Sequence, residues 1–256
     1  MSSQWNLIGD LPPLGADEVQ IWRIGMDDAA ALIGHYTPFL NAEEQARASR
    51  HRAGQVRDHF IIGRACLRAL LGNALKIDAN NIEFAEGVHG KPEIASIEDH
   101  DIEFNVAHSQ NTVLIALGRQ GSVGVDVEYF DRATDVMEVA QANFTQNESD
   151  ALAAIADPEA RLQTFYRYWT RKEAVGKADG RGLLLPLASF DVSFRTMESQ
   201  PVHIDGPSHN QRKSYFVSDL DLGEKAAAAV ALQSSPSHIK KMVFPLGRHR
   251  AAAAGQ

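Results

Sequence analysis

The stretch Val123-Gly-Val-Asp-Val-Glu128 alternates valines with a glycine and two acids. Successive side chains of a strand point to opposite faces, so a strand here turns its valines to the core and turns Asp126 and Glu128 to the other face. Two carboxylates on one face suit a divalent cation, because Mg²⁺ prefers oxygen ligands. Taken alone, the same pattern is also typical of the solvated face of a half-buried strand.

A second stretch, Trp169-Thr-Arg-Lys-Glu-Ala-Val-Gly-Lys177, has helical spacing. Trp169, Glu173 and Lys177 recur every four residues, so a helix presents an indole, a carboxylate and an ammonium on one stripe. Glu173 with Lys177 alone would be an ordinary surface ion pair, and Trp169 alone favours a place in the core. The glycine-rich segment 178–182 that follows would let the backbone approach a ligand closely. Together with the acids of the first stretch, this set predicts Mg²⁺ held against a pyrophosphate.

Two shorter clusters have the character of a nucleotide site. Gly90-Lys91-Pro92 places a cation on a rigid turn, and Asn105-Val-Ala-His-Ser109 places His108 just beyond a strand. A single histidine of this kind is more often structural than a phosphate ligand. A dense set of arginines in the first long helical segment suits an anion in an otherwise acidic protein. These arginines are Arg47, Arg50, Arg52, Arg57 and Arg64.

Composition describes an ordinary globular protein of 256 residues with a formal net charge of −8. The negative charge argues against extensive nucleic-acid binding. The only cysteine, Cys66, excludes an intramolecular disulfide, fits a reducing compartment and favours a buried structural thiol. The first residues lack a signal-peptide pattern and no apolar run reaches membrane-spanning length, so we expect a cytoplasmic protein with no membrane partner.

The first half of the chain predicts a strand, a long helix and a group of short strands. Residues 18–24 alternate as a strand does. Asn41 and Glu44 indicate a capping box at the start of one helix that runs through Leu71 and ends near Gly72. The short strands are expected at 82–84, 102–106, 113–117 and 123–128.

The second half repeats the order of helices followed by strands. Helices are expected between residues 135 and 179, and strands near 190–194, 215–219 and 227–232. The fold class is therefore α+β, with two similar lobes. We expect an N-terminal lobe over 1–122, a C-terminal lobe over 123–235, and a C-terminal extension over 236–256 that is flexible at its end.

Taken in this order, the motifs resemble those of the surfactin-type 4′-phosphopantetheinyl transferases. The resemblance spans roughly residues 40–195, and its specificity comes from several separate motifs with the family's spacing. The matching pieces are Gly90-Lys91-Pro92, Phe104-Asn-Val-Ala-His-Ser109, Val123-Gly-Val-Asp-Val-Glu128, and Phe165 through Lys177 with Gly180-Arg-Gly-Leu183 and Leu185-Pro186 after it.

The resemblance implies a pseudo-twofold monomer of two α+β lobes, with coenzyme A and Mg²⁺ bound in the cleft between them and Mn²⁺ as an alternative metal. It implies transfer of 4′-phosphopantetheine from coenzyme A to a serine hydroxyl of an apo acyl or peptidyl carrier protein. Adenosine 3′,5′-bisphosphate would be released. Such carriers serve fatty acid, polyketide or non-ribosomal peptide synthesis.

The same resemblance implies a role for individual residues. Asp126, Glu128 and Glu173 match metal ligands, and Glu173 also matches a base for the serine proton. Lys177 matches a lysine that contacts the pyrophosphate, and Glu148 matches a glutamate sometimes assigned to proton transfer. The coenzyme A pocket would be lined by Arg47, Arg57, Lys91, Pro92 and His108.

Two departures from the family pattern are visible. Ala107 stands where many members have serine, which removes a hydroxyl that could contact phosphate. His59 stands where a second helix arginine is expected, so phosphate binding there would depend on pH.

Two other functions are compatible with parts of the pattern. A Mg²⁺-dependent nucleotide pyrophosphatase could use the same ions to activate water, and it would label no protein. A non-catalytic carrier-binding module could leave the acids on a solvated surface. It would not need Lys177 beside the acids, and Asp126→Ala would leave its function intact.

Overall fold

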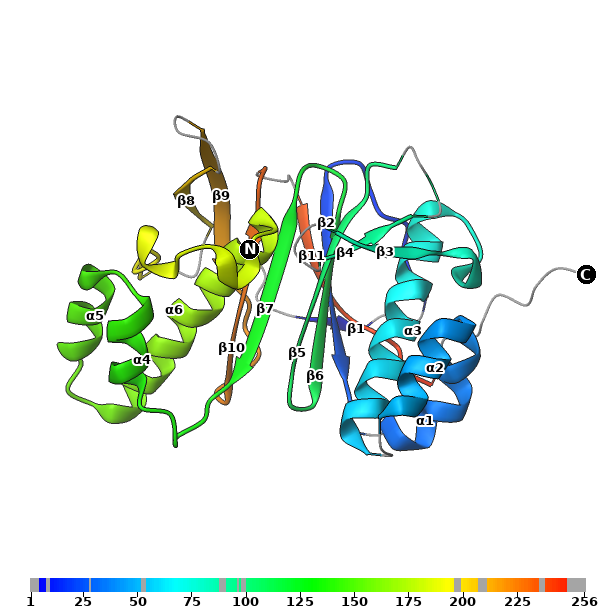
Figure 1. Cartoon of the computed structure of the whole chain (residues 1–256), viewed down its shortest axis with the longest axis horizontal. Coiled ribbons are helices and arrows are strands. Elements are labelled where there is room, and N and C mark those ends of the chain that lie inside the picture. Colours follow the sequence, from blue (N-terminus) through cyan, green and yellow to red (C-terminus); the bar gives the residue numbers. More distant parts are fainter. Residues whose placement is uncertain are drawn as a thin grey trace, which may run out of the picture.

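Figure 1 shows two groups of helices on the outside of the molecule with strands between them. The computed structural model describes residues 5–7, 10–27, 29–51, 54–87, 91–95, 97, 100–195, 199–206, 211–234 and 238–247. These residues form two lobes that each combine helices with a sheet. The predicted α+β class is confirmed.

The first lobe is built on a sheet that, within the described residues, has five strands in the order β1-β11-β2-β6-β5. The β2–β6 and β6–β5 neighbours are antiparallel. The predicted strand at 18–24 is confirmed as β2. The bounds are β1 Asn6–Leu7, β2 Glu18–Gly25, β5 Glu103–Ser109, β6 Thr112–Gly118 and β11 His238–Val243.

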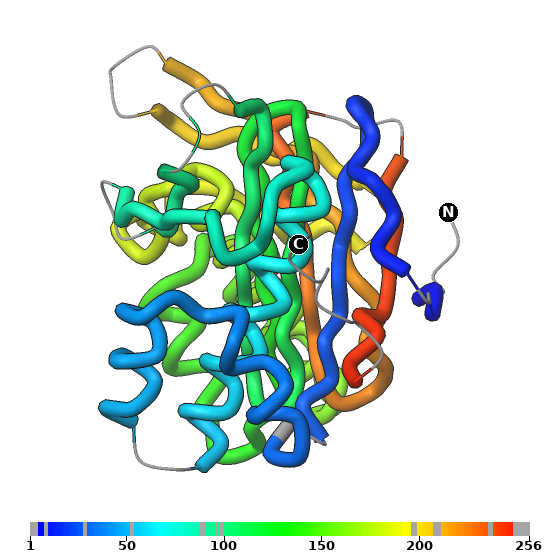
Figure 2. The backbone as a smooth tube through the Cα atoms, turned by 90° about the vertical axis from the view of Figure 1, so that its right-hand side faces the viewer, coloured from blue at the N-terminus to red at the C-terminus, as the bar shows by residue number. Residues whose placement is uncertain are grey.

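Strand β11 comes from the last part of the chain but lies inside the first lobe. It pairs in parallel with both β2 and β1. Figure 2 shows the blue β2 beside the orange-red β11, so opposite ends of the sequence meet in one sheet. The segment that the sequence assigns to a C-terminal extension therefore contributes an internal strand of this sheet, between β1 and β2.

Three helices cover the outer face of the first sheet: α1 (Ala29–Tyr36), α2 (Ala42–Arg50) and α3 (Gln55–Leu75). The capping box of Asn41 and Glu44 is confirmed at the start of α2. The prediction of one continuous helix is wrong, because the backbone is extended at His51 and Gly54 has a φ of +141°. The helix also continues past Gly72 and ends at Lys76, which is left-handed. A short hairpin, β3 (Phe84–Glu86) with β4 (Pro92–Ile94), follows.

The second lobe is built on a sheet that has, in the described part of the chain, four strands in the order β7-β10-β9-β8. Its helices are α4 (Val136–Asn143), α5 (Gln146–Ala153) and α6 (Pro158–Asp179), as expected between residues 135 and 179. The strands are β7 Val123–Tyr129, β8 Gln200–Asp205, β9 Arg212–Asp219 and β10 Ala226–Leu232.

The expected strand at 190–194 is wrong, because this segment forms no ladder. Its backbone bonds to side chains of neighbouring helices. The Val192 N–H donates to Glu148 at 2.7 Å, and Arg171 donates to the carbonyls of Val192 and Phe194 at 2.8 and 2.7 Å. Buried polar backbone groups need partners, and side chains supply them here.

The described apolar residues form a core between α3 and the first sheet, a core between α6 and the second sheet, and a core between the two sheets. Val123, Val125 and Val127 lie in the core between the sheets, as their alternation predicts. The opposite face of β7 is covered by α6 rather than by solvent, and Asp126 is only 4% exposed. The solvated-face interpretation of that acid is therefore wrong. No helix in the described ranges is long and apolar enough to span a bilayer.

Candidate active site

A glycine allows helix α6 to lie directly on strand β7. A Cβ built on Gly124 would overlap the carbonyl oxygen of Ala174 and the backbone nitrogen of Ala178. Only glycine permits this approach of backbone to backbone. The last turns of α6 therefore pass over the face of β7 that carries Asp126 and Glu128.

Helix α6 brings the predicted stripe to this face. It starts at Asp157, whose carboxylate accepts from the N–H groups of Glu159 and Ala160, and it ends at the left-handed Gly180. Trp169 packs on the rings of Phe144 and Phe165 at 6.2 and 6.0 Å between centroids. Trp169 is thus a packing residue, while Glu173 and Lys177 lie beside the acids of β7.

Asp126, Glu128, Glu173 and Lys177 form an acidic centre between β7 and α6. Nζ of Lys177 donates to Oδ1 of Asp126 at 2.7 Å. The second oxygen of Asp126, Oδ2, and Oε1 of Glu173 are buried with no hydrogen-bond partner in the protein. Unsatisfied buried oxygens are uncommon in native structures and call for an unseen ligand.

Burial dominates the electrostatics of this centre. It raises the pKa of Asp126 to about 7, against the opposing effect of Lys177, and Glu128 and Glu173 add to the rise. Burial also raises the pKa of Glu173, where Lys177 opposes the shift and Glu128 adds to it. Three carboxylates that repel one another in a low-dielectric site are a favourable place for a cation.

Strand β5 supplies a polar contact to the same centre. Oγ of Ser109 donates to Oε2 of Glu128 at 3.1 Å and accepts from the backbone N–H of Tyr129 at 3.2 Å. Four residues before Ser109 on the same strand, Oδ1 of Asn105 accepts from the N–H of Val125 at 2.9 Å. The centre thus receives residues from both lobes.

The donor set fits a hard divalent cation, although its present arrangement is not a finished metal site. Among the residues that the structure describes, no three His, Cys, Asp or Glu side chains converge well enough to hold a metal. The chemistry fits nonetheless, because two buried carboxylate oxygens of this centre have no partner and Mg²⁺ prefers such ligands. Asp126 and Glu173 would hold the ion, with Glu128 beside them.

Comparison with known proteins decides the class of this site. The sequence profile of the 4′-phosphopantetheinyl transferase superfamily matches residues 122–231, and that of the 4′-phosphopantetheinyl transferase N-terminal domain matches residues 29–119. The chain is 34% identical over 169 residues to the 4′-phosphopantetheinyl transferase HetI of Nostoc sp., covering 66% of this chain and 71% of HetI. This chain belongs to the 4′-phosphopantetheinyl transferase superfamily.

Further relatives agree with this assignment. The transferase is 28% identical over 210 residues to the 4′-phosphopantetheinyl transferase Sfp of Bacillus subtilis, covering 82% of this chain and 90% of Sfp. It is 25% identical over 210 residues to the human L-aminoadipate-semialdehyde dehydrogenase-phosphopantetheinyl transferase, covering 76% of this chain and 67% of the human protein. The resemblance that the motifs carry is therefore confirmed.

The structure separates two residues that the sequence assigns to one pocket of the transferase. Nζ of Lys91, just before Pro92 of β4, donates to Glu103 at 3.2 Å, at the start of β5. His108 is exposed near the other end of β5, about 16 Å along the strand at its usual rise. A single ligand that reaches both residues must therefore extend along β5. Gly90, which precedes Lys91, lies outside the described residues.

His108 has a second histidine beside it. Burial lowers the pKa of His59 on α3, His108 lowers it further, and Asp58 opposes the shift. An anion bound beside His59 would oppose this shift and favour the protonated form of His59. The departure that places His59 on this helix therefore gives a histidine whose charge would respond to an anionic ligand.

The two predicted helix arginines of the transferase lie on different helices. Arg47 is exposed on α2, with its guanidinium 5.1 Å from the ring centroid of Phe60. Arg57 on α3 bonds to Asp58 at 3.0 Å. Neither is buried, so both are available to a ligand, and their role in coenzyme A binding stays a prediction. Arg52 lies outside the described residues.

Glu148 is apart from the acidic centre. Its side chain is fully buried and accepts from Nζ of Lys172 at 2.8 Å, while its other oxygen accepts from Val192. It also closes a capping box with Thr145 at the start of α5. Both oxygens are engaged, which favours a structural role, and proton transfer by Glu148 stays an untested prediction.

Sequence reasoning missed three residues that shape the site. Asn105 and Ser109 lie inside a recognised motif but received no role, and Lys172 was not paired with Glu148. A polar residue directly between two apolar residues of a strand, here Phe104 and Val106, is the signal that points to Asn105. Nothing local points to the pairing of Lys172, because its partner is 24 residues away in the sequence.

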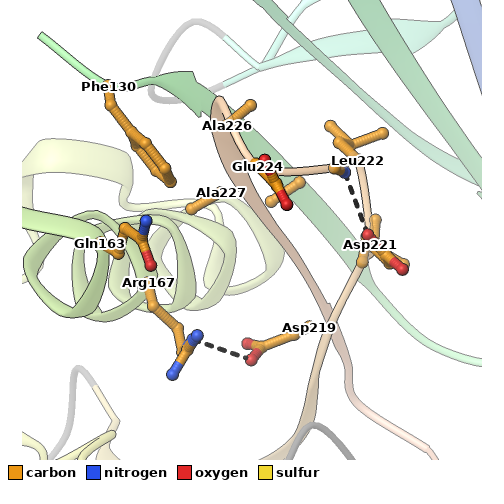
Figure 3. Close-up of a pocket in the computed structure, with 12 residues that line it drawn as sticks. Phe130, Gln163, Arg167, Asp219, Asp221, Leu222, Glu224, Ala226 and Ala227 are labelled. Carbon is orange, nitrogen blue, oxygen red and sulfur yellow. Dashed lines mark hydrogen bonds and ion pairs between the residues drawn. The ribbon is translucent and has the colours of Figure 1, made fainter. Parts of the chain in front are cut away.

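A separate pocket of about 220 Å³ lies on another side of α6. Figure 3 shows Gln163 and Arg167 of the helix facing the turn between β9 and β10, with Phe130 beside them. Arg167 pairs with Asp219 at 3.5 Å. None of the four residues of the acidic centre lines this pocket, so it is not the reaction site.

Proposed function

We propose that this transferase moves 4′-phosphopantetheine from coenzyme A to a serine hydroxyl of an apo acyl or peptidyl carrier protein, with Mg²⁺ as cofactor and adenosine 3′,5′-bisphosphate as product. The observation that carries the proposal is the acidic centre. Two buried carboxylate oxygens without partners lie beside a lysine, between β7 and α6, in a chain of this superfamily. Mn²⁺ is an alternative metal.

The chain's own residues then have distinct tasks. The serine oxygen attacks the phosphorus that bears pantetheine, and the bond from that phosphorus to the adenosine bisphosphate breaks. Glu173 accepts the serine proton, because burial raises its pKa toward neutrality and makes it a better base. Lys177 stabilises the charge that develops on the leaving phosphate. A bound divalent cation neutralises the pyrophosphate.

Residues of the first lobe would bind the nucleotide part of coenzyme A. We assign Lys91, Pro92 and His108 to this task, with Arg47 and Arg57 contributing positive charge. His59 beside His108 supports an anion at this place, because an anionic group would favour the protonated form of His59.

The decisive experiment measures the intact mass of an apo carrier protein after incubation with this chain, coenzyme A and Mg²⁺. A gain of one phosphopantetheine group, absent with Asp126→Ala, would support the reaction and the metal role together. Consumption of coenzyme A without labelling of several unrelated carriers would favour a pyrophosphatase. Neither labelling nor consumption would favour a binding module.

Other sequence predictions stay untested. They are the monomeric state, the lobe boundaries at 122 and 235, the cytoplasmic location and the absence of nucleic-acid or membrane partners. The lobe boundary near residue 122 is supported by the start of β7 at Val123, the first strand of the second sheet. The location rests on the lone Cys66, which is buried.

A further inference from the structure

The contact between Lys177 and Asp126 places an ammonium on the carboxylate that would hold the metal. Nζ of Lys177 lies 2.7 Å from Oδ1 of Asp126, and the lysine side chain is 26% exposed against 6% for the aspartate. A metal at the free Oδ2 would lie close to this ammonium, and like charges repel at this range. The ammonium therefore weakens the attraction of this carboxylate for a metal.

The lysine leaves the rest of the donor set unsatisfied. Oδ2 of Asp126 and Oε1 of Glu173 remain buried without partners while Lys177 bonds to Oδ1. A single ammonium therefore neutralises part of a cluster that carries three carboxylates. The arrangement resembles a metal site in which the ammonium of Lys177 stands in for the metal but bonds to only one of the carboxylates.

We infer that Lys177 acts as an internal competitor that keeps the metal affinity of the free protein low, and that it releases Asp126 when metal and pyrophosphate arrive. This inference rests on the proposed function of the acidic centre. The ammonium moves from a carboxylate oxygen to a phosphate oxygen, and the vacated carboxylate receives the metal. No bond is broken other than hydrogen bonds.

The exposure of Lys177 makes such a movement feasible. Among the described residues, Lys177 donates one hydrogen bond, to Asp126, whereas Lys172 on the same helix is fully buried and donates to two backbone carbonyls as well as to Glu148. Lys172 is held in place, and Lys177 is free to turn about a single contact. The helix thus carries one fixed and one releasable lysine.

The inference has a thermodynamic consequence. A phosphate ligand that attracts Lys177 must tighten metal binding, and the metal must tighten binding of that ligand by the same factor. The free protein would bind metal weakly, and the metal would enter chiefly with a pyrophosphate-bearing substrate. The lysine that stabilises the leaving phosphate would therefore also set the order of binding.

The test is calorimetric titration of Mn²⁺ into the full chain without coenzyme A. We expect Lys177→Met to bind Mn²⁺ about tenfold more tightly than the wild type. Lys213→Met is the matched control, because Lys213 pairs with buried Asp179 at 2.8 Å near the same helix end but does not contact the acidic centre. It should leave the affinity within about twofold of the wild type. If Lys177→Met does not fold, Lys177→Gln takes its place.

A second measurement uses the wild-type protein alone. Acetylation of lysines, followed by peptide mass spectrometry, should label Lys177 several-fold faster with saturating Mn²⁺ than without it, whereas the labelling of Lys213 should not change. Equal or weaker Mn²⁺ binding by the Lys177 variants, or labelling of Lys177 that is unaffected by metal, would overturn the inference.

The outcomes separate this inference from the proposed function. If the wild-type protein labels an apo carrier but the Lys177 variants bind Mn²⁺ no more tightly, the competitor role fails and the transfer reaction stands. If no variant binds Mn²⁺ at all, the metal role of the acidic centre fails as well, and the carrier mass measurement then decides separately whether transfer occurs.

Discussion

Oδ1 of Asn105 accepts a hydrogen bond at 2.9 Å from the backbone N–H of Val125, and this contact joins the sheets of the two lobes. Strand β7 is an edge of its sheet, so its outward N–H groups lack ladder partners on that side. Asn105 is 7% exposed and supplies one such partner. A side chain of the first lobe thereby positions the strand that carries Asp126.

Replacing Asn105 with alanine should therefore destabilise the protein. The buried N–H of Val125 would lose its partner, which costs about 1–3 kcal/mol of unfolding free energy. Urea unfolding measures the change. Asn80→Ala, at an exposed position, is the control and should change the free energy by less than about 0.5 kcal/mol. Equal effects of the two substitutions would contradict the role of Asn105.

Gly124→Ala should separate α6 from β7. The new methyl group would meet the backbone of Ala174 and Ala178, which cannot move as a flexible side chain can. We expect a loss of about 1–3 kcal/mol in unfolding free energy. Transfer activity should fall as well, because Glu173 and Lys177 would move away from β7.

Gly25→Ala is the matched control for this substitution. A Cβ at Gly25 meets nothing within 4 Å, and the residue is the exposed last residue of strand β2. Its unfolding free energy should stay within about 0.5 kcal/mol of the wild type. A Gly124→Ala protein with wild-type stability would show that α6 does not need this close approach.

Glu148→Ala should be strongly destabilising. Glu148 and Lys172 are both fully buried, so the substitution leaves an uncompensated ammonium in the core, which costs about 3–5 kcal/mol. Glu159→Ala, which breaks the exposed pair with Arg132, should cost only about 0–1 kcal/mol. Thermal melting compares the two. A stable Glu148→Ala protein that lacks activity would instead favour proton transfer by Glu148.

Asp126 should impose a pH dependence on stability. Burial raises its pKa in the folded state from 3.8 to about 7, so the folded protein binds a proton that the unfolded chain has lost between these values. The contribution of Asp126 to stability is therefore fully present below pH 3.8 and is lost as pH rises to about 7.

The comparison of the wild type with Asp126→Asn isolates this effect from other titrating groups. Without added metal, the difference in unfolding free energy, wild type minus variant, should decrease from about pH 4 to about pH 7 and stay level above it. Urea unfolding across this range measures it. A difference that is flat, or that increases with pH, would show that Asp126 ionises normally.

Local sequence was a good guide where the facing of a side chain depends on a single strand or helix. The alternation in residues 123–128 predicted which side chains of β7 face the core, and the four-residue spacing placed Glu173 and Lys177 on one stripe of α6. The capping box at Asn41 was likewise visible. In each case the geometry of a strand, helix or helix end follows from neighbours a few residues apart.

Local sequence was a poor guide where distant groups satisfy the backbone. Residues 190–194 have strand-like composition, yet Arg171 and Glu148 bond to their backbone and replace a ladder. The place of β11 in the first sheet also depends on packing across the molecule. Such partners are absent from any short window of sequence.

The sequence by itself determined the α+β class, the resemblance to the transferase family, and the identity and facing of the residues in the acidic centre, because these depend on residue type and on the fixed periods of helix and strand. The tertiary structure alone decided that α6 covers the acids of β7, that Asn105 and Ser109 reach them from the other lobe, and that Lys177 bonds to Asp126. These relationships depend on how two lobes and two sheets pack, since burial and close approach set the charge, pKa and partners of each group.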